Sequence, residues 1–276
     1  MQGLLQNRFG AGHKVRQRSN EGRNRMSDKV AVVTGAARGI GLATTDLFLE
    51  NGWKVVMVDR DGAELWQAAQ SRDGVLAVTR DVSNPQDVGA MVREALEWGG
   101  RIDALVNNAG VAEFGPMGEC DFDMWRRVMS TNLDGVFLCT QEAVEALKQS
   151  RGAVVNIASI SGLRASTLRV AYGTSKAAVI QLSKQQAAEL GDHGVRVNCV
   201  APGPVRTKLA MAVHSQDIID AYHDAIPLNR YGSEREIAEV IVFLCSDKAS
   251  FVTGQVVAAD GGFESTGVGL PALRQD

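Results

Sequence analysis

The sequence predicts an α/β protein with a doubly wound, seven-stranded parallel sheet and helices on both faces of that sheet. Short valine-rich apolar runs recur along the chain, and they are nearly continuous, as in strands that are covered on both faces. Segments with helical spacing separate them, and this alternation favours right-handed crossovers between parallel strands. The expected strands are Val30–Val33, Val55–Val58, Val75–Val78, Ala104–Val106, Ala153–Ile157, Val195–Val200 and Val256–Ala259.

The segments between these strands predict helices, for example at Leu42–Asn51, Asp87–Trp98 and Ile237–Cys245. We expect residues 26–276 to form one domain, because no linker or internal repeat interrupts them. Residues 1–25 carry a net charge of +5 and few large apolar groups, whereas the other 251 residues carry −8. We therefore expect a flexible basic extension before Met26, which resembles a natural start.

Composition excludes several classes of protein. The chain has 276 residues, 45% of them hydrophobic and 22% charged, as in an ordinary globular protein. No stretch approaches roughly 18 consecutive apolar residues, so we expect no membrane span. The acidic body argues against nucleic-acid binding. Four cysteines stand at positions without metal-ligand spacing, and there is no apolar secretory signal, so we expect no metal and a cytoplasmic protein with reduced thiols.

The first expected strand ends in a glycine-rich turn that opens onto a helix. The turn reads Thr34-Gly35-Ala36-Ala37-Arg38-Gly39-Ile40-Gly41. Glycines let the backbone approach a ligand closely, and the N–H groups and positive dipole at a helix start favour a pyrophosphate. The spacing G-x-x-x-G-x-G departs from the G-x-G-x-x-G dinucleotide fingerprint. Alone, the turn predicts either a dinucleotide site or a tight strand–helix turn without a ligand.

An acid at the end of the second strand indicates which dinucleotide would bind. Asp59 can accept hydrogen bonds from both ribose hydroxyls of an adenosine group, and it would repel a 2′-phosphate. Arg38 and Arg60 are alternatives that would attract that phosphate. Because Asp59 is the better placed of the three, we expect NAD rather than NADP. A solvated loop acid without a ligand is the competing interpretation.

A tyrosine and a lysine at i and i+4 predict acid–base chemistry. Tyr172 and Lys176 share one face of the expected helix Ala171–Leu190. A tyrosine with a pKa of about 10 is a poor base at neutral pH, but a nearby ammonium lowers that pKa. Ser159 follows the strand Ala153–Ile157 and could hydrogen-bond a substrate oxygen. A surface Tyr–Lys pair and a turn serine are the competing interpretations of these residues.

In this order and spacing, these residues resemble the short-chain dehydrogenase/reductase family, in its shorter single-domain branch, from Met26 to about Gly262. The resemblance implies a Rossmann-type fold. Further matching segments follow in family order: Asp81-Val82 as an adenine-contacting pair, Asn107-Asn108-Ala109-Gly110 as a sheet-stabilising and cofactor-contacting segment, Asn132 as a catalytic asparagine, Pro202-Gly203-Pro204-Val205-Arg206-Thr207 as the nicotinamide loop and Asp260-Gly261-Gly262 as a C-terminal turn.

The resemblance implies reversible hydride transfer between a nicotinamide and a secondary alcohol or ketone. It implies that Tyr172 is the general acid/base, that Lys176 lowers the pKa of Tyr172 and holds the nicotinamide ribose, that Ser159 positions the substrate oxygen and that Asn132 keeps a water in a proton relay. The implied cofactor-binding residues are Gly35, Arg38, Gly39, Ile40, Gly41, Asp59, Arg60, Asp81, Val82, Asn108, Ala109, Gly110, Tyr172, Lys176, Pro202, Gly203, Val205 and Thr207.

Two other functions compete with an NAD-dependent alcohol dehydrogenase. One is an NADPH-dependent ketoreductase, for example of a 3-oxoacyl thioester, and Asp59 argues against it. The other is a dinucleotide-binding sensor without catalysis, and the intact set of four catalytic residues argues against it. The family also implies a homotetramer or homodimer with contacts through the long helices Asn132–Leu147 and Ala171–Leu190.

The motifs do not identify the substrate. The polar segment from Lys208 to Tyr231 predicts a mobile lid over the substrate pocket. Arg164 and Arg169 are pocket neighbours that could bind a carboxylate or a phosphate, and solvated loop arginines are the competing interpretation. The small-molecule partner is therefore an alcohol or carbonyl compound of unspecified class.

Overall fold

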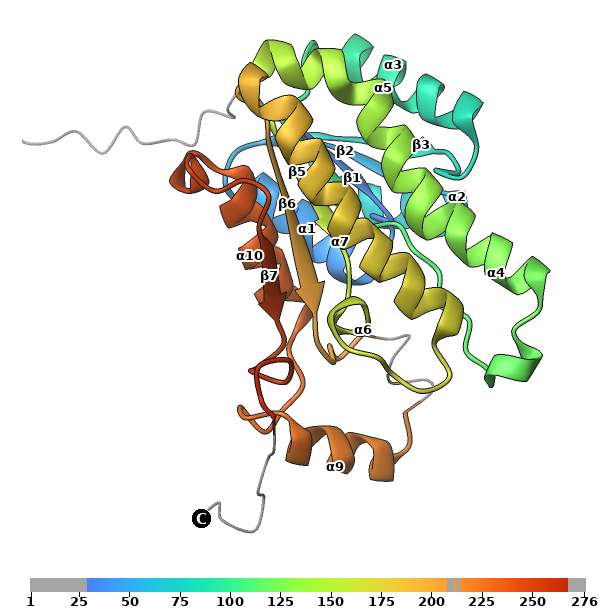
Figure 1. Ribbon diagram of the computed structural model, residues 1–276. Coiled ribbons are helices and arrows are strands. Elements are labelled where there is room, and N and C mark those ends of the chain that lie inside the picture. The colour runs from blue at the N-terminus through green and yellow to red at the C-terminus, as the bar shows by residue number, and fades with distance from the viewer. Residues whose placement is uncertain (1–28, 208–210, 212–213, 268–276) are drawn as a thin grey trace, which may run out of the picture.

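The computed structural model describes residues 29–207, 211 and 214–267, and it confirms the predicted doubly wound sheet (Figure 1). Seven parallel strands lie in the order β3-β2-β1-β4-β5-β6-β7. The N-terminal extension, part of the predicted lid and most of the C-terminal tail lie outside the described residues. The strands are β1 (Val30–Thr34), β2 (Lys54–Asp59), β3 (Val75–Thr79), β4 (Ala104–Asn107), β5 (Ala153–Ile157), β6 (Arg196–Pro202) and β7 (Val256–Ala259).

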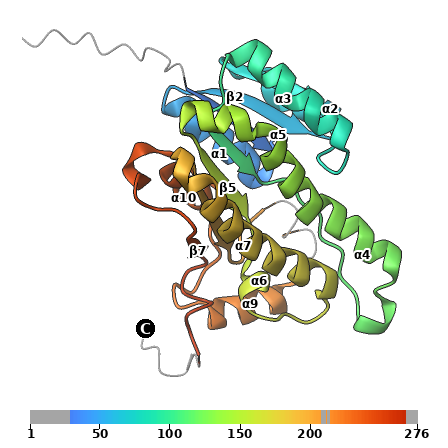
Figure 2. The same ribbon diagram turned by 45° about the horizontal axis from the view of Figure 1, so that its top comes forward.

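Helices cover both faces of this sheet, as two views of the molecule show (Figures 1 and 2). Helices α3, α5 and α7 lie on one face, and α1, α2 and α10 pack on the other. The helices are α1 (Gly39–Glu50), α2 (Gly62–Ala69), α3 (Pro85–Gly99), α4 (Phe122–Met129), α5 (Gly135–Ser150), α6 (Ile160–Leu163), α7 (Val170–Leu190), α9 (Gln216–Ala225) and α10 (Glu234–Cys245).

Strand β1 shows why the apolar runs are continuous. Successive side chains of a strand point to opposite faces, so a central strand of this sheet needs apolar residues at every position. Val30 and Val32 pack with α3 and α5, whereas Ala31 and Val33 pack with α1 and α10. All four are buried. The two hydrophobic cores therefore pack on opposite faces of this one strand.

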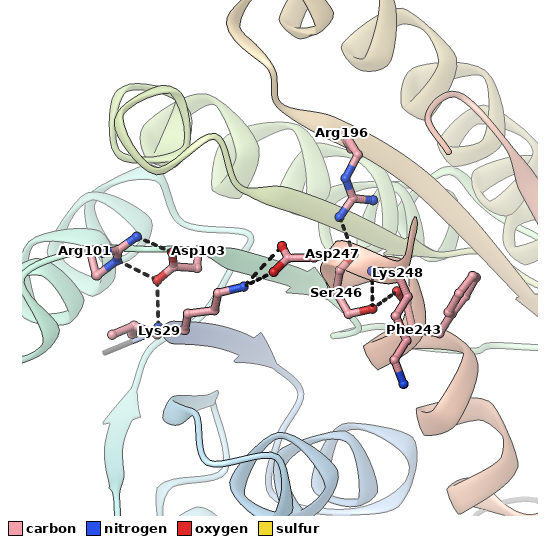
Figure 3. Close-up of polar contacts among 9 residues, drawn as sticks. Lys29, Arg101, Asp103, Arg196, Phe243, Ser246, Asp247 and Lys248 are labelled. Atoms are coloured by element: carbon pink, nitrogen blue, oxygen red, sulfur yellow. Dashed lines mark hydrogen bonds and ion pairs between the residues drawn. The ribbon is translucent and has the colours of Figure 1, made fainter. Parts of the chain in front are cut away.

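The amino ends of the strands are joined by polar contacts (Figure 3). Asp103, just before β4, accepts a hydrogen bond from the Val30 N–H at 2.9 Å. It also forms an ion pair with Arg101, which donates two hydrogen bonds to its carboxylate. Arg196 at the start of β6 donates to the carbonyls of Leu244 and Ser246 at 2.6 and 3.1 Å. Every charged group named here has a partner, so this edge of the sheet stabilises the fold.

Two helix boundaries differ from the sequence predictions. Helix α1 begins at Gly39, three residues before the predicted start at Leu42, because the glycine turn itself forms the first helical turn. The helix predicted to begin at Asn132 begins as α5 at Gly135, after a π-helical turn over Ser130–Asp134. This wider turn connects α4 to α5 and carries Asn132. Single π turns inside helices often mark functional sites.

Candidate active site

A cleft of about 700 Å³ opens at the carboxyl ends of the strands. Its wall includes Gly35 and Gly39 after β1, Asp59 at the end of β2, Asp81 after β3 and Asn108 after β4. Strands β1 and β4 are neighbours in the sheet, although β2 and β3 lie between them in sequence. The strand order reverses at this point, and ligands of doubly wound sheets bind at such a switch point. The predicted glycine turn and the predicted acid are therefore brought into one cleft.

Close backbone packing explains the glycines of the turn. Gly35 has a φ of +65°, and a Cβ there would lie 2.9 Å from the Ala109 Cα atom. A Cβ on Gly41 would lie 2.1 Å from the Gly35 carbonyl oxygen. The Asn108 side-chain amide fastens the turn by donating to the carbonyls of Thr34 and Gly35 at 2.9 and 3.1 Å.

Gly39 behaves differently from Gly35 and Gly41. It has a φ of +62°, and within 4 Å a Cβ there would meet only the Glu234 carboxylate. The space beside it belongs to the cleft. Arg38 is the N-cap residue of α1, and its side chain accepts no hydrogen bond from the first backbone N–H groups of the helix. A backbone that can be approached closely, at the positive end of a helix, fits a pyrophosphate.

The acid end of the cleft is negatively charged. The Asp59 carboxylate accepts hydrogen bonds from the Ala37 N–H at 3.1 Å and the Asp61 N–H at 3.0 Å. Arg38, an alternative partner for a 2′-phosphate, forms an ion pair with Asp61 and lies 3.8 Å from the Glu64 carboxylate. A ribose with two free hydroxyls fits this arrangement, because the hydroxyls can donate to the remaining lone pairs of Asp59.

The four predicted catalytic residues gather beside the cleft. Lys176 is buried in α7, and its Nζ atom donates to the Ile157 carbonyl at 2.8 Å. That Nζ atom lies 5.8 Å from the centre of the Tyr172 ring. Ser159 is buried at the N-cap of α6, and its hydroxyl acts to lower the pKa of Tyr172. A Cβ on Gly110, in the cleft wall, would lie 3.5 Å from Lys176 Nζ, so the lysine adjoins the cleft.

Asn132 holds the loop after β4 against α7. It is fully buried, its Oδ1 atom accepts from the Val111 N–H at 2.8 Å, and its Nδ2 atom donates to the Val111 carbonyl at 2.9 Å. The same Nδ2 atom donates to Ser175 Oγ at 3.1 Å, one residue before Lys176. The π turn therefore presents an amide that fixes both the cleft wall and the lysine.

The ionisation of the tyrosine and the lysine is governed by burial. Burial raises the pKa of Tyr172, while the hydrogen bond with Ser159 and the positive charge of Arg169 lower it in part. Burial also lowers the pKa of Lys176 to about 8. The sequence predicted that Lys176 would lower the pKa of Tyr172 below its ordinary value. In the structure the net direction is the opposite, because removing the phenolate from water costs more than its neighbours return.

The structure sorts the predicted cofactor residues into two groups. Those that line the cleft are Gly35, Arg38, Gly39, Asp59, Arg60, Asp81, Val82, Asn108, Ala109, Gly110 and Thr207. Those outside its lining are Ile40, Gly41, Tyr172, Lys176, Pro202, Gly203 and Val205. Gly203 lies against the Asp260 turn, where a Cβ would come within 2.6 Å of the Asp260 side chain.

Six further lining residues were not predicted from the sequence: Val58, Asp61, Arg80, Val111, Thr131 and Glu234. Val111 and Thr131 each adjoin a predicted residue, so proximity to a motif was the available signal. Glu234 comes from the start of α10, and no motif marks it. Among the described residues, no group of metal-ligating side chains gathers, and no helix has the length and apolar character to cross a membrane.

Comparison with known proteins supports this arrangement. A family model described as enoyl-(acyl carrier protein) reductase matches residues 35–264. The 2-(S)-hydroxypropyl-CoM dehydrogenase 3 of Xanthobacter autotrophicus is 36% identical, over 87% of this chain and 98% of its own. The 3-oxoacyl-[acyl-carrier-protein] reductase FabG of Thermotoga maritima is 37% identical, over 86% of this chain and 98% of its own. The crystal structure of levodione reductase superposes with a TM-score of 0.83 and 32% sequence identity, over 87% of this chain and 99% of that chain.

Proposed function

Because the chain belongs to the short-chain dehydrogenase/reductase family, we propose that it transfers a hydride between NAD(H) and a secondary alcohol or its ketone. The observation that carries this proposal is the placement of Ser159, Tyr172 and buried Lys176 beside one cleft whose far end holds Asp59. The relatives include an alcohol dehydrogenase and a ketoreductase, which are the two directions of one reaction.

The protein groups divide the work of binding and proton transfer. The glycine turn would hold the pyrophosphate, Asp59 the adenosine ribose and Lys176 the nicotinamide ribose. The nicotinamide, when bound, supplies the hydride chemistry. Tyr172 removes the alcohol proton during oxidation and returns it during reduction. Ser159 orients the substrate oxygen, and Asn132 acts as a positioning residue because it ties Val111 to Ser175.

NAD is favoured over NADP by the charge at the ribose end of the cleft. Three carboxylates gather there, those of Asp59, Asp61 and Glu64, and Arg38 is already paired with two of them. A 2′-phosphate would approach these acids, and like charges at short range are unfavourable. Of the other two arginines in the lining, Arg80 is paired with Glu94 and Arg60 is exposed.

An NADPH-dependent ketoreductase is the second candidate, since the FabG relative acts on 3-oxoacyl groups. The test is a screen of diverse secondary alcohols and ketones with both cofactors, followed by the absorbance of the reduced nicotinamide. We expect turnover with NAD(H). Faster turnover of a 3-oxoacyl thioester with NADPH would favour the second candidate, whereas cofactor binding without any turnover would favour a sensor.

We further propose a cytoplasmic homo-oligomer. All four cysteines are free thiols, which suits a reducing compartment. The helices that the family uses for contacts include α5, where Phe137 is about half exposed. A monomer mass by light scattering would contradict the assembly, and a dimer or tetramer mass would support it.

A further inference from the structure

The loop between α6 and α7 carries two arginines, Arg164 and Arg169, with different surroundings. Arg164 Nη1 donates to the carbonyl of Phe263 at 2.7 Å and lies 3.4 Å from that of Thr266. Its guanidinium also lies 5.3 Å from the centre of the Phe263 ring. Arg164 is therefore used to hold the segment that follows β7, and a ligand would have to displace these contacts.

The guanidinium of Arg169 lies on the catalytic side of the same loop. It sits 4.7 Å from the centre of the Phe114 ring, and Phe114 meets the Tyr172 ring edge-on at 6.0 Å. Its Nη1 atom lies 3.4 Å from Ser161 Oγ, two residues after the catalytic serine. The cation thus borders the place where the substrate oxygen meets Tyr172. Arg169 is absent from the lining of the dinucleotide cleft.

Arg169 has no carboxylate partner within the described ranges, although it is only partly exposed. Some other arginines do have one, such as Arg72 with Asp46 and Arg235 with Glu50, whereas Arg164 and Arg196 donate to backbone carbonyls. Glu113, the acid beside Phe114 in sequence, is paired with Arg127, which donates two hydrogen bonds to it at 3.1 and 2.8 Å. A partly buried cation without a counter-charge is costly, so its position near Tyr172 points to an anionic ligand.

The backbone before Arg169 is held in a strained conformation. Leu168 has a φ of +62°, in the left-handed region that disfavours a large side chain, and that side chain is about half exposed. The Gly115 N–H donates to the Leu168 carbonyl at 3.0 Å, which ties this loop to the one that carries Phe114. Strain of this kind concentrates at ligand-binding sites, where it aims a side chain.

The positive charge of Arg169 reaches groups on both sides of it. Burial raises the pKa of Tyr172, and Arg169 acts against that rise together with Ser159. Burial lowers the pKa of His214, and the charge of Arg169 lowers it further. His214 stacks on Tyr222 and hydrogen-bonds to the hydroxyl of Tyr231 at 3.0 Å. The charge of Arg169 therefore acts on the tyrosine and on a histidine of this aromatic cluster.

We propose that Arg169 binds a carboxylate of the substrate, so that the enzyme acts on secondary hydroxy acids and the matching oxo acids. The inference rests on the proposed function. A planar guanidinium offers paired N–H donors that match the two oxygens of a carboxylate, and it retains its charge at every working pH. The carbinol carbon then faces Tyr172 while the acid group faces Arg169.

The test compares acids with uncharged amides that have the same carbinol: 3-hydroxybutyrate with its amide, and trans-4-hydroxycyclohexanecarboxylate with its amide. We expect kcat/KM to favour at least one acid by about 100-fold, the scale of two charge-assisted hydrogen bonds. Arg169→Gln should bring the acid/amide ratio towards 1, and Arg169→Lys should leave it intermediate. The control Arg164→Gln removes the same charge from the same loop, and the ratio should keep its wild-type value.

Two results would overturn the inference. One is an acid/amide ratio near 1 in the wild-type enzyme for both pairs. The other is an Arg169→Gln variant that loses both activities equally, which would make the arginine a support for Phe114 only. Turnover of neutral alcohols without a preference for acids would leave the proposed function standing, whereas no turnover of any alcohol or ketone would remove that function.

A binding measurement separates these cases without catalysis. Calorimetry in the presence of NAD compares cyclohexanecarboxylate with cyclohexanecarboxamide, which lack the reacting hydroxyl. We expect tighter binding of the acid to the wild-type enzyme and equal affinities in Arg169→Gln. Equal affinities in the wild-type enzyme would contradict the proposal even if the enzyme has no activity.

Discussion

The ion pairs at the amino edge of the sheet differ from the surroundings of the two cations beside Tyr172 at the carboxyl edge. At the amino edge, Asp103 is paired with Arg101, and Lys29 with Asp247 (Figure 3). At the carboxyl edge, buried Lys176 has a backbone carbonyl as its partner, and Arg169 has no carboxylate partner among the described residues. Arg38 at the carboxyl edge does pair with Asp61, so the contrast is between the ion pairs of the amino edge and the two cations nearest Tyr172, which have no carboxylate partner among the described residues.

This difference separates the support of the fold from the capacity to bind. A buried charge that is paired and hydrogen-bonded is satisfied, and losing its partner costs stability. A buried or half-buried charge without a counter-ion raises the free energy of the protein without ligand. A ligand that supplies the opposite charge or the missing hydrogen bond removes this cost when it binds. We therefore expect substitutions at the carboxyl edge to change catalysis, and those at the amino edge to change the free energy of unfolding.

The largest expected effect is on catalysis, at Tyr172. Tyr172→Phe removes the hydroxyl that we propose exchanges a proton with the substrate, and it keeps the ring that packs on Phe114. We expect kcat to fall by about 1000-fold, the scale of losing a general acid/base, while the Kd of NAD(H) by fluorescence titration stays close to wild type. Retained turnover would contradict the assignment of this tyrosine.

The next effect is on stability, at Asp103. Asp103→Ala leaves the buried Val30 N–H and the Arg101 guanidinium without their acceptor. We expect the free energy of unfolding, from chemical denaturation, to fall by about 3 kcal/mol. Asp103→Asn is the matched control, because its amide oxygen can still accept from the Val30 N–H, and it should lose less. In both variants kcat/KM at 25 °C should stay near wild type, since the cleft lies at the other edge.

The effect of buried Lys176 on the free energy of unfolding depends on pH. Because burial lowers its pKa from 10.5 to about 8, the unfolded chain binds more protons than the folded one between these values. The full cost of charging the buried lysine is therefore present below pH 8, and it disappears as the pH rises towards 10.5. Lys176→Met removes this cost together with the activity.

We expect Lys176→Met without cofactor to exceed the wild-type enzyme in free energy of unfolding at pH 7, by an amount on the order of 2 kcal/mol. The difference between the two proteins should shrink between pH 8 and 10. Denaturation at both pH values measures it, and the subtraction cancels other titrating groups. A variant that is less stable at pH 7 would show that the hydrogen bond to Ile157 outweighs the cost of burying the charge.

Periodicity predicted the sheet well because burial on both faces leaves a direct mark on the sequence. The strands Ala153–Ile157 and Val256–Ala259 have the predicted bounds, and the other strands differ by one or two residues at their ends. Most of the residues of the predicted cofactor motifs line one cleft at the carboxyl ends of the strands. The π turn that carries Asn132 could not be predicted, because its hydrogen bonds depend on packing against α7.

The chemistry of single groups was harder to predict than their position. Arg164 and Arg169 stand five residues apart in one polar loop, and nothing local distinguishes them. Only the fold brings the Phe263 carbonyl to Arg164 and leaves Arg169 beside Phe114. The pKa of Tyr172 shows the same limit: the spacing of a motif reports which charges are near, but it does not report the burial that raises this pKa in the structure.

The smallest expected effect tests whether pairing or burial makes the amino edge stabilising. Lys29 Nζ lies 3.1 Å from the Asp247 carboxylate, which is 92% exposed, and 5.2 Å from the centre of the Trp53 ring. Exposed ion pairs gain little, because water and salt screen them. We expect Lys29→Ala to lower the free energy of unfolding by about 0.5 kcal/mol at low salt and by less at 1 M salt. A loss as large as that of Asp103→Ala would mean that charge pairing itself stabilises this edge, and that the depth at which Asp103 is buried adds little.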